Sequence, residues 1–196
     1  PAQRVWRVVP VARRASAPAW VVGSLVHEAL AVWRFPEEGV AAESTRGFEQ
    51  WARSRGREFG IGDAQQLADA VRRSRQLLVR FRAHRLHGEI DGAEARLHEV
   101  PYSLLVDGRV ESGIIDLVYR RDGEWTIVEF KTDRVRDRSE LERLLAGEGY
   151  HAQAQRYVAA GARLLGQTPR FVLCLLNFAG SVYLYHRLQA GDAATP

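Results

Sequence analysis

Lysine is almost absent from this chain of 196 residues. Lysine and arginine together number 28, and Lys131 is the only lysine, so arginine supplies every other side-chain cation of this kind. Arginine is a wide, planar and permanently charged fork, whereas lysine is a compact charge whose pKa falls readily on burial. A single surface lysine could be chance, but a position that cannot accept arginine would also retain it. The residues around Lys131 must decide between these interpretations.

Cysteine and long apolar runs are also scarce. Cys174 is the only cysteine, so the chain has no internal disulfide framework and cannot by itself hold a cysteine-ligated iron–sulfur cluster. Its apolar surroundings, FVLCLL, predict a buried and inert thiol. No apolar run approaches the ~20 residues that span a bilayer, and the first residues lack the apolar stretch of a signal peptide. We therefore expect a cytoplasmic protein.

The charge balance is mildly basic. The formal net charge is +4 and the pI is about 9.6, which weakly favours a polyanionic partner. Arginines gather in residues 71–85 and again in residues 134–143. The first run has helical spacing, with Arg72, Arg73, Arg80 and Arg82 largely on one side. A solvated amphipathic helix is its ordinary interpretation, and contact with phosphates is the alternative.

The order of predicted elements favours one α/β or α+β domain with a central mixed sheet flanked by helices. Helical spacing predicts helices over residues 20–35, 44–55 and 63–87, with Pro36 ending the first. Strand-like runs follow over residues 95–106, 109–121 and 124–133, joined by Asp107-Gly108 and Asp122-Gly123 turns. A helix pair over residues 138–166 is divided at Gly147–Gly149, and strands over residues 170–178 and 181–188 complete the pattern. Within a single domain, 1–196, we expect a linker-like segment (1–19), a helical region (20–90), a core (91–188) and a frayed tail (189–196).

Two carboxylates and the single lysine lie on adjacent predicted strands. Residues two apart in a strand share a face, so Glu129 and Lys131 point to the same side. Asp116 interrupts the apolar run GIIDLVY, where a buried carboxylate is costly unless it is paired or holds a metal. Pairing of Tyr119 with Thr126 across the hairpin would bring Asp116 close to Glu129.

This cluster supports two interpretations. Its carboxylates could hold a hard divalent cation, which would activate a water molecule and polarise a phosphoryl oxygen. Lys131 would then place the water or stabilise developing negative charge, where a bulky guanidinium would fit poorly. The alternative is a partly buried ion pair among Asp116, Glu129 and Lys131. These three residues alone do not decide between the two.

Four motifs in a fixed order resemble the RecB-like branch of the PD-(D/E)XK nuclease superfamily. GSLVHEAL is similar to its Gly-x-x-x-His helix, GIIDLVYR to its Gly-x-x-Asp strand, VEFKTD to its (Asp/Glu)-x-Lys strand, and YHAQAQRYVAA to its Tyr-x-x-Gln-x-x-x-Tyr helix. The match runs from about Gly23 to Tyr157, and the four motifs together are far more specific than any one. This branch forms the nuclease domain at the C-terminus of AddA- and RecB-type helicase–nucleases of the UvrD family, and it also occurs in stand-alone exonucleases.

The resemblance implies a restriction-endonuclease-like fold and a site for Mg²⁺ or Mn²⁺. The implied metal ligands are His27, Asp116, Glu129 and the backbone carbonyl of Phe130. The implied catalytic residues are Asp116, Glu129, Lys131, Gln153 and Tyr157. In this assignment Gln153 and Tyr157 contact the nucleic-acid backbone or orient Lys131.

Four further residues are weaker candidates for substrate contact or support of the site: Gly23, Glu99, Thr132 and Tyr150. Each also has an ordinary interpretation. Gly23 would be a helix-packing position, Glu99 an exposed charge at a strand end, and Thr132 a plain strand-end hydroxyl. Tyr150 and Tyr157 share a helix stripe with Gln153, which usually indicates core residues, although such an aromatic face could stack a base of single-stranded DNA.

The resemblance implies a metal-dependent deoxyribonuclease, an exonuclease that acts on single-stranded DNA in double-strand-break processing and recombinational repair. A helicase domain in the same or a partner chain would feed the DNA, because no segment resembles a Walker A loop. One alternative is a non-catalytic DNA-binding scaffold. The presence of His27, Asp116, Glu129 and Lys131 disfavours it, because such scaffolds lose their ligands. Another is a stand-alone nuclease of phage or defence type, although many such relatives carry a cysteine-ligated cluster.

Overall fold

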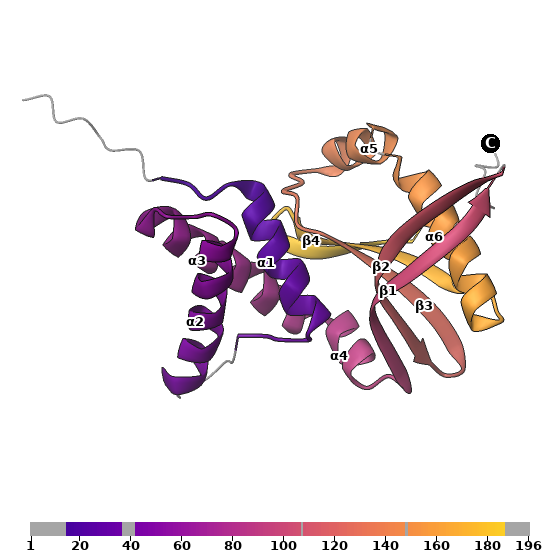
Figure 1. The fold of residues 1–196 in the computed structure, drawn as a ribbon, viewed down its shortest axis with the longest axis horizontal. Helices are drawn as coiled ribbons and strands as arrows, with labels where there is room; N and C mark the ends of the chain where they lie inside the picture. Colours follow the sequence, from indigo (N-terminus) through magenta and orange to yellow (C-terminus); the bar gives the residue numbers. More distant parts are fainter. Residues whose placement is uncertain (1–14, 37–41, 107, 148, 187–196) are drawn as a thin grey trace, which may run out of the picture.

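The structure is a computed structural model that describes residues 15–36, 42–106, 108–147 and 149–186 (Figure 1). Its elements, in chain order, are α1 (Ala19–Ala31), α2 (Ala42–Glu58), α3 (Ala64–Arg82), α4 (Arg85–Asp91), β1 (Ala95–Val106), β2 (Arg109–Arg121), β3 (Glu124–Lys131), α5 (Arg138–Gly147), α6 (Tyr150–Leu165), β4 (Arg170–Phe178) and β5 (Ser181–Tyr185). None of the helices in these ranges is long and apolar enough to cross a membrane.

The strands form one mixed sheet in the order β1-β2-β3-β4-β5. The first three strands are an antiparallel meander, β3 and β4 are parallel, and β4 and β5 are antiparallel. Parallel neighbours require a crossover, which α5 and α6 supply between β3 and β4. The predicted mixed sheet is confirmed, as is the predicted pairing of Tyr119 with Thr126.

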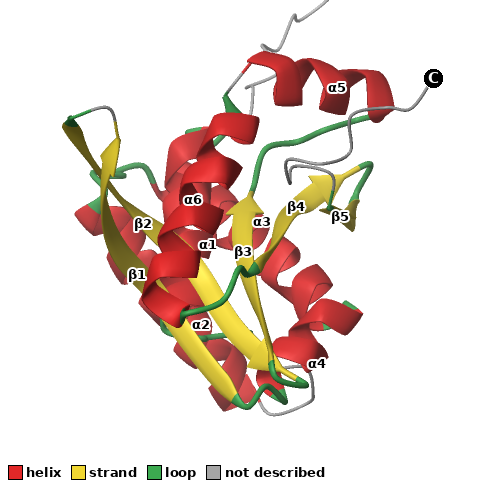
Figure 2. Cartoon of the chain, turned by 90° about the vertical axis from the view of Figure 1, so that its right-hand side faces the viewer, coloured by secondary structure: helices red, strands yellow, loops and turns green. Residues whose placement is uncertain are grey.

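Helices cover both faces of the sheet. Because side chains alternate along a strand, Val128 and Phe130 of β3 pack with α1, α3 and α4, while Ile127 packs with α5 and α6. The ring of Phe130 meets that of Phe81 from α3 edge-on, with centroids 5.2 Å apart. Figure 2 shows α6 crossing one face of the sheet while α1 to α3 lie behind the other. Cys174 is fully buried, as predicted, on the side of the sheet that packs against α1, α3 and α4.

The first helix ends earlier than predicted, at Ala31, so Pro36 does not terminate it. Trp33 adopts a φ of 51° and leaves the helical path. Its indole Nε1 donates to Asp91 at 2.9 Å, and its ring stacks on His87 with centroids 5.2 Å apart. Tertiary contacts to α4 therefore end this helix, a signal that local periodicity does not contain.

The predicted helix over residues 63–87 is two helices, α3 and α4. His84 takes an extended ψ of 144°, and its Nδ1 accepts a hydrogen bond from the amide of Leu86. His84 thus acts as the N-cap of α4, a role less familiar than that of Ser, Thr or Asp. Helical spacing on both sides of this cap concealed the break.

The other predicted elements are confirmed within a few residues. Asp122 and Gly123 both have positive φ in the β2–β3 hairpin, as a tight turn between twisted strands requires. The division of the helix pair falls before Gly149, the N-cap of α6. Several predicted features lie outside the described residues: most of the linker-like segment, Asp107, the last two residues of the final strand and the tail.

We expect a Gly161→Ala substitution to lower the free energy of unfolding by about 1–2 kcal/mol, because overpacking outweighs the helix-forming gain of alanine. A Cβ atom at Gly161 would lie 2.7 Å from Cγ of Pro169 and 3.0 Å from Cδ1 of Ile127. Gly88→Ala is the matched control, since a Cβ on that helical glycine meets nothing within 4 Å. Urea unfolding of both variants checks this, and equal stability of the two would contradict it.

Candidate active site

The candidate site lies where β2 and β3 separate. Their antiparallel ladder runs from the hairpin to the pair Leu117–Val128 and is not continued beyond it. The next donor on β3, the amide of Phe130, instead donates to Oδ2 of Asp116 at 2.8 Å. The aspartate side chain therefore replaces a backbone partner at the fork, which holds one carboxylate oxygen at a fixed position between the two strands.

His27 approaches the other oxygen of Asp116 from α1. Its Nδ1 lies 3.3 Å from Oδ1, with 34% of the histidine side chain and 15% of the aspartate side chain exposed. Burial by itself lowers the pKa of His27, but the hydrogen bond and charge of Asp116 more than offset this, so the pKa is raised. The helix motif and the strand motif thus meet in space, as the resemblance implied.

Glu129 is the most deeply buried charged group of the site, with 4% of the residue exposed. Its Oε1 accepts from Nζ of Lys131 at 2.9 Å and from Nε2 of Gln153 at 3.1 Å. Its Oε2 is buried and accepts no hydrogen bond from any residue in the described part of the chain. Burial, reinforced by the charge of Asp116, raises the pKa of Glu129 to about 7.

Helix α6 supports Glu129 through a chain of hydrogen bonds. Gln153 also donates to the Tyr157 hydroxyl at 2.9 Å, and that hydroxyl donates to the carbonyl of Ile114 on β2 at 2.9 Å. Burial and the charge of Glu129 raise the pKa of Tyr157 above its ordinary value, which keeps this hydroxyl a donor. The i, i+3, i+7 stripe of α6 therefore joins both strands of the fork.

Lys131 extends from Glu129 over the ring of Tyr150, with Nζ 5.0 Å from the ring centroid. Both tyrosines of the stripe are buried, Tyr150 at 3% and Tyr157 at 6% exposed. They shape the pocket of the lysine and the glutamate from within the core. The hypothesis that their faces stack a DNA base is therefore wrong, because neither ring is accessible to a base.

The glycines of two motifs permit close approach. A Cβ at Gly113 would lie 2.8 Å from the ring of Tyr102, which packs edge-on against Tyr157 at 5.5 Å. A Cβ at Gly23 would lie 3.2 Å from Oγ1 of Thr132, just after Lys131. Gly23 thus places the start of α1 directly against the end of β3.

Glu99 lies on β1 near the same carboxylates but is exposed to solvent. It has a φ of 49°, an uncommon value for a residue other than glycine. Burial and the charge of Asp116 raise its pKa, whereas His27 lowers it. Glu99 is exposed, as one prediction expected, but it lies within β1 rather than at its end. Its support of the site stays a prediction.

The donor set suits a hard divalent cation in its chemistry. It consists of an imidazole and two carboxylates, and the unpartnered, buried Oε2 of Glu129 is an oxygen atom available as a ligand. Among the residues that the structure describes, no three His, Cys, Asp or Glu side chains already surround one point as a complete ligand set. The predicted ligands are neighbours, and their assignment as ligands stays a prediction, as does that of the Phe130 carbonyl.

A cavity of about 950 Å³ adjoins this cluster. Gly23 and Thr132 line it, together with arginines from α3 and from the segment after β3. The sequence showed both arginine-rich runs but gave no sign that they meet. Trp20 also lines the cavity, and the spacing of Trp20, Gly23 and His27 along one stripe of α1 could have indicated it.

We expect the stability advantage of Glu129→Gln over the wild type, measured in EDTA, to grow by about 1–3 kcal/mol between pH 5 and pH 8. In the folded protein the pKa of Glu129 is about 7, above its ordinary value of 4.5. The stability that the protonated carboxyl group contributes to the wild type is therefore complete at low pH and is lost as the pH rises. Glutamine does not titrate. Urea unfolding at several pH values measures the difference, with exposed Glu142→Gln as the control; a pH-independent difference for Glu129→Gln would refute the prediction.

The chain is similar to known proteins in its family and in its fold. A family model described as the PD-(D/E)XK nuclease superfamily matches residues 2–191. Among solved structures, a candidate exonuclease from Eubacterium rectale is similar with a TM-score of 0.57 and 13% identity, over 92% of this chain and 61% of that chain. Protein VC1899 from Vibrio cholerae aligns with a TM-score of 0.34 and 14% identity, over 81% of this chain and 41% of its own. A search of curated proteins found no match.

The Eubacterium rectale structure shares the fold of this chain, a mixed sheet between helical layers. This chain spans less than two thirds of the length of that protein. The family match covers nearly the whole chain, from before α1 to beyond β5. The superfamily is named after an aspartate and a later (Asp/Glu)-x-Lys triplet. Asp116, Glu129 and Lys131, at the fork of β2 and β3, fit this pattern. The chain belongs to the PD-(D/E)XK nuclease superfamily.

Proposed function

We propose that this chain hydrolyses phosphodiester bonds of DNA in a reaction that depends on Mg²⁺ or Mn²⁺. The observation that carries the proposal is the arrangement at the fork. One carboxylate is fixed by a backbone amide and faced by His27, and the second is buried with one oxygen unpartnered and the other bound to the only lysine. Most buried carboxylate oxygens have a hydrogen-bond partner, so an unpartnered one is more typical of a ligand site than of a purely structural ion pair.

In this proposal His27, Asp116, Glu129 and the carbonyl of Phe130 hold the cation, which supplies an activated water and polarises the phosphoryl oxygen. The protein contributes the placement of these groups. The Phe130 amide fixes Asp116, and Gln153 fixes the Oε1 side of Glu129, so Oε2 keeps its direction. Positions fixed before substrate binds require little reorganisation during the reaction.

Lys131 supplies the positive charge nearest the carboxylates. Its ammonium is held between Glu129 and the ring of Tyr150, with 20% of the side chain exposed. From there it would orient the attacking water or stabilise charge on the scissile phosphate. A compact ammonium presents its charge at one point beside Glu129, whereas a guanidinium spreads its charge over a wider plane. In this proposal that difference accounts for the single lysine in a chain of arginines.

We further propose an exonuclease that acts on single-stranded DNA within a helicase–nuclease, in double-strand-break processing. The resemblance of the four motifs supports this context, and the name of the Eubacterium rectale protein supports only its exonuclease part. The helicase would belong to the same or a partner chain. The presence of His27, Asp116, Glu129 and Lys131 at one fork favours a catalytic domain over a scaffold that has lost its ligands.

We expect cleavage of labelled DNA in Mg²⁺ or Mn²⁺ and none in EDTA. Asp116→Asn should lower the rate at least ~100-fold, because it removes the charge faced by His27, and Lys131→Ala should do the same. Exposed Glu142→Gln on α5 is the control and should cleave like the wild type. Incubation of single-stranded and duplex substrates with each protein measures this. Cleavage that persists in EDTA or in either site variant would refute the mechanism, and inactivity of the wild type with both metals would favour the scaffold.

We expect Lys131→Arg to lose cleavage while the protein remains folded, because charge is retained but the compact shape is not. The rate of DNA cleavage and the urea-unfolding midpoint, measured together, separate the two effects. Full activity of Lys131→Arg would show that the position needs only a positive charge.

A further inference from the structure

The arginine-lined cavity beside the candidate active site has no role in the chemistry described so far. It lies between the start of α1, the helix α3, the segment after β3 and the β4–β5 turn. Five arginines line it: Arg72, Arg73, Arg80, Arg134 and Arg136. Of the acidic residues in the described ranges, only Asp69 and Asp133 line it. We propose that this cavity binds the backbone of single-stranded DNA next to the scissile phosphate, and that Trp20 stacks on one of its bases.

The cavity is continuous with the catalytic cluster. Gly23 and Thr132, which are in contact range of each other, both line it. Gly23 precedes His27 by one helical turn, and Thr132 directly follows Lys131. A strand whose scissile phosphate lies at Lys131 would therefore meet the cavity within the next nucleotides. This inference rests on the proposed function, because it takes DNA as the substrate.

The arginines of the cavity fall into two sets. Arg73 donates to the carbonyl of Ala17 at 3.1 Å, Arg80 donates to Oδ1 of Asn177 at 3.3 Å, and Arg72 is paired with Asp69. These contacts hold three guanidinium groups in place along α3. They leave the other donors of each fork available, since a guanidinium carries five N–H groups.

Arg134 and Arg136 form the second set. Both are exposed, and neither forms an ion pair with an acidic side chain of the described ranges. Concentrated positive charge without compensation destabilises a folded protein and is relieved by a polyanion, which also releases its counterions on binding. The volume of about 950 Å³ exceeds what a lone phosphate ion needs and accommodates a short stretch of chain.

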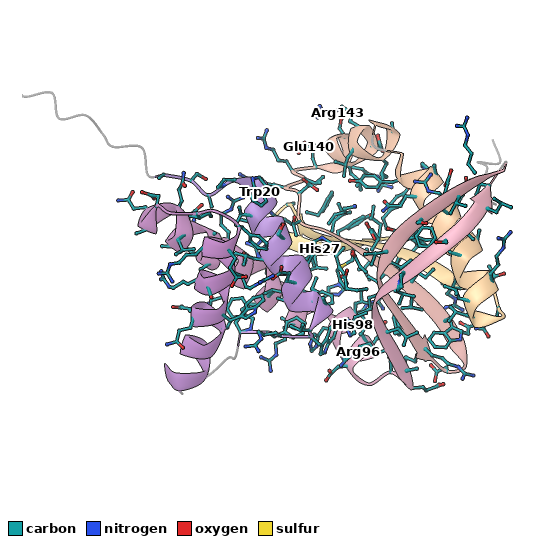
Figure 3. The ribbon with its side chains drawn as sticks, viewed as in Figure 1. Trp20, His27, Arg96, His98, Glu140 and Arg143 are labelled. Carbon is teal, nitrogen blue, oxygen red and sulfur yellow. The ribbon has the colours of Figure 1, made fainter. Side chains whose placement is uncertain are left out.

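Trp20 distinguishes a single strand from a duplex. Its side chain is 59% exposed, and Phe59 contacts it edge-on with centroids 6.1 Å apart, so a ring face is left accessible. Trp20 and His27 lie two turns apart on α1, about 10 Å along the helix axis. Figure 3 shows Trp20 on the part of α1 that is nearer to α5. Unpaired bases stack on such aromatic faces, whereas bases in a duplex already stack on each other.

The test is fluorescence anisotropy with a labelled 20-nucleotide oligothymidylate, in EDTA so that the DNA stays intact. At low salt we expect the double variant Arg134→Ala/Arg136→Ala to bind at least ~5-fold more weakly and to lower the salt slope by about 1.4, the value for two lost phosphate contacts on a single strand. Trp20→Ala should weaken binding ~5-fold or more with an unchanged slope, and Trp20→Phe should restore most of it. A blunt duplex competitor should show no effect of Trp20→Ala.

The matched control is Arg163→Ala. Arg163 is an exposed arginine on α6, the helix on the opposite face of the sheet, and no acidic side chain in the described ranges pairs with it. It should bind DNA like the wild type. Circular dichroism confirms the fold of each variant.

Cleavage in Mg²⁺, measured on the same proteins, separates this inference from the proposed function. If the wild type cleaves DNA and the cavity variants bind like Arg163→Ala, the nuclease proposal stands and the cavity assignment is overturned. If the cavity variants lose binding but the wild type cleaves nothing with either metal, the cavity assignment stands and the nuclease proposal fails. Absence of wild-type binding to single-stranded DNA, in EDTA and in Ca²⁺, would overturn the cavity assignment.

Discussion

The separation of β2 from β3 after the pair Leu117–Val128 is the constraint on which the candidate site depends. A continuous ladder would occupy the backbone donors with neighbouring carbonyls and leave no place for a carboxylate. At the fork, the amide of Phe130 is satisfied by Asp116 instead. A buried carboxylate is costly without donors, so the fork both provides the position for Asp116 and supplies the hydrogen bond that makes it tolerable.

The fork also lets two helical layers act on one site. A sheet normally isolates the helices on its two faces, and here the cores on the two sides are separate clusters. His27 reaches Asp116 from α1 on one side, while Gln153 reaches Glu129 from α6 on the other. Because burial and the charge of Asp116 raise the pKa of Glu129, placing this carboxyl group beside Asp116 opposes folding at neutral pH. Such a cost is typical of groups retained for chemistry rather than for stability.

How well each feature could be predicted follows from the range of the interactions that produce it. The hairpin register was predictable because the Asp122-Gly123 turn fixes which residues face each other. That register brings Asp116 and Glu129 to the fork, one residue past the pair Leu117–Val128. The ends of α1 and α3 were not predictable, because Trp33 is held by Asp91 and His87, and His84 caps α4. The burial of Tyr150 and Tyr157 depends on how α6 packs on the sheet, and helical spacing alone cannot distinguish an accessible stripe from a buried one.

The sequence by itself determined the order of the elements, the mixed sheet, and the spacing that puts Glu129 and Lys131 on one face of a strand. These features depend on neighbours in the chain or on a short turn, and local rules describe them. Only the tertiary structure decided that Glu129 keeps one buried oxygen without a partner, and that the arginines of α3 and of residues 134–136 line one cavity beside Trp20. The first feature depends on Gln153 of α6, 24 residues along the chain, and the second joins segments more than fifty residues apart. Both depend on how whole helices pack against the sheet.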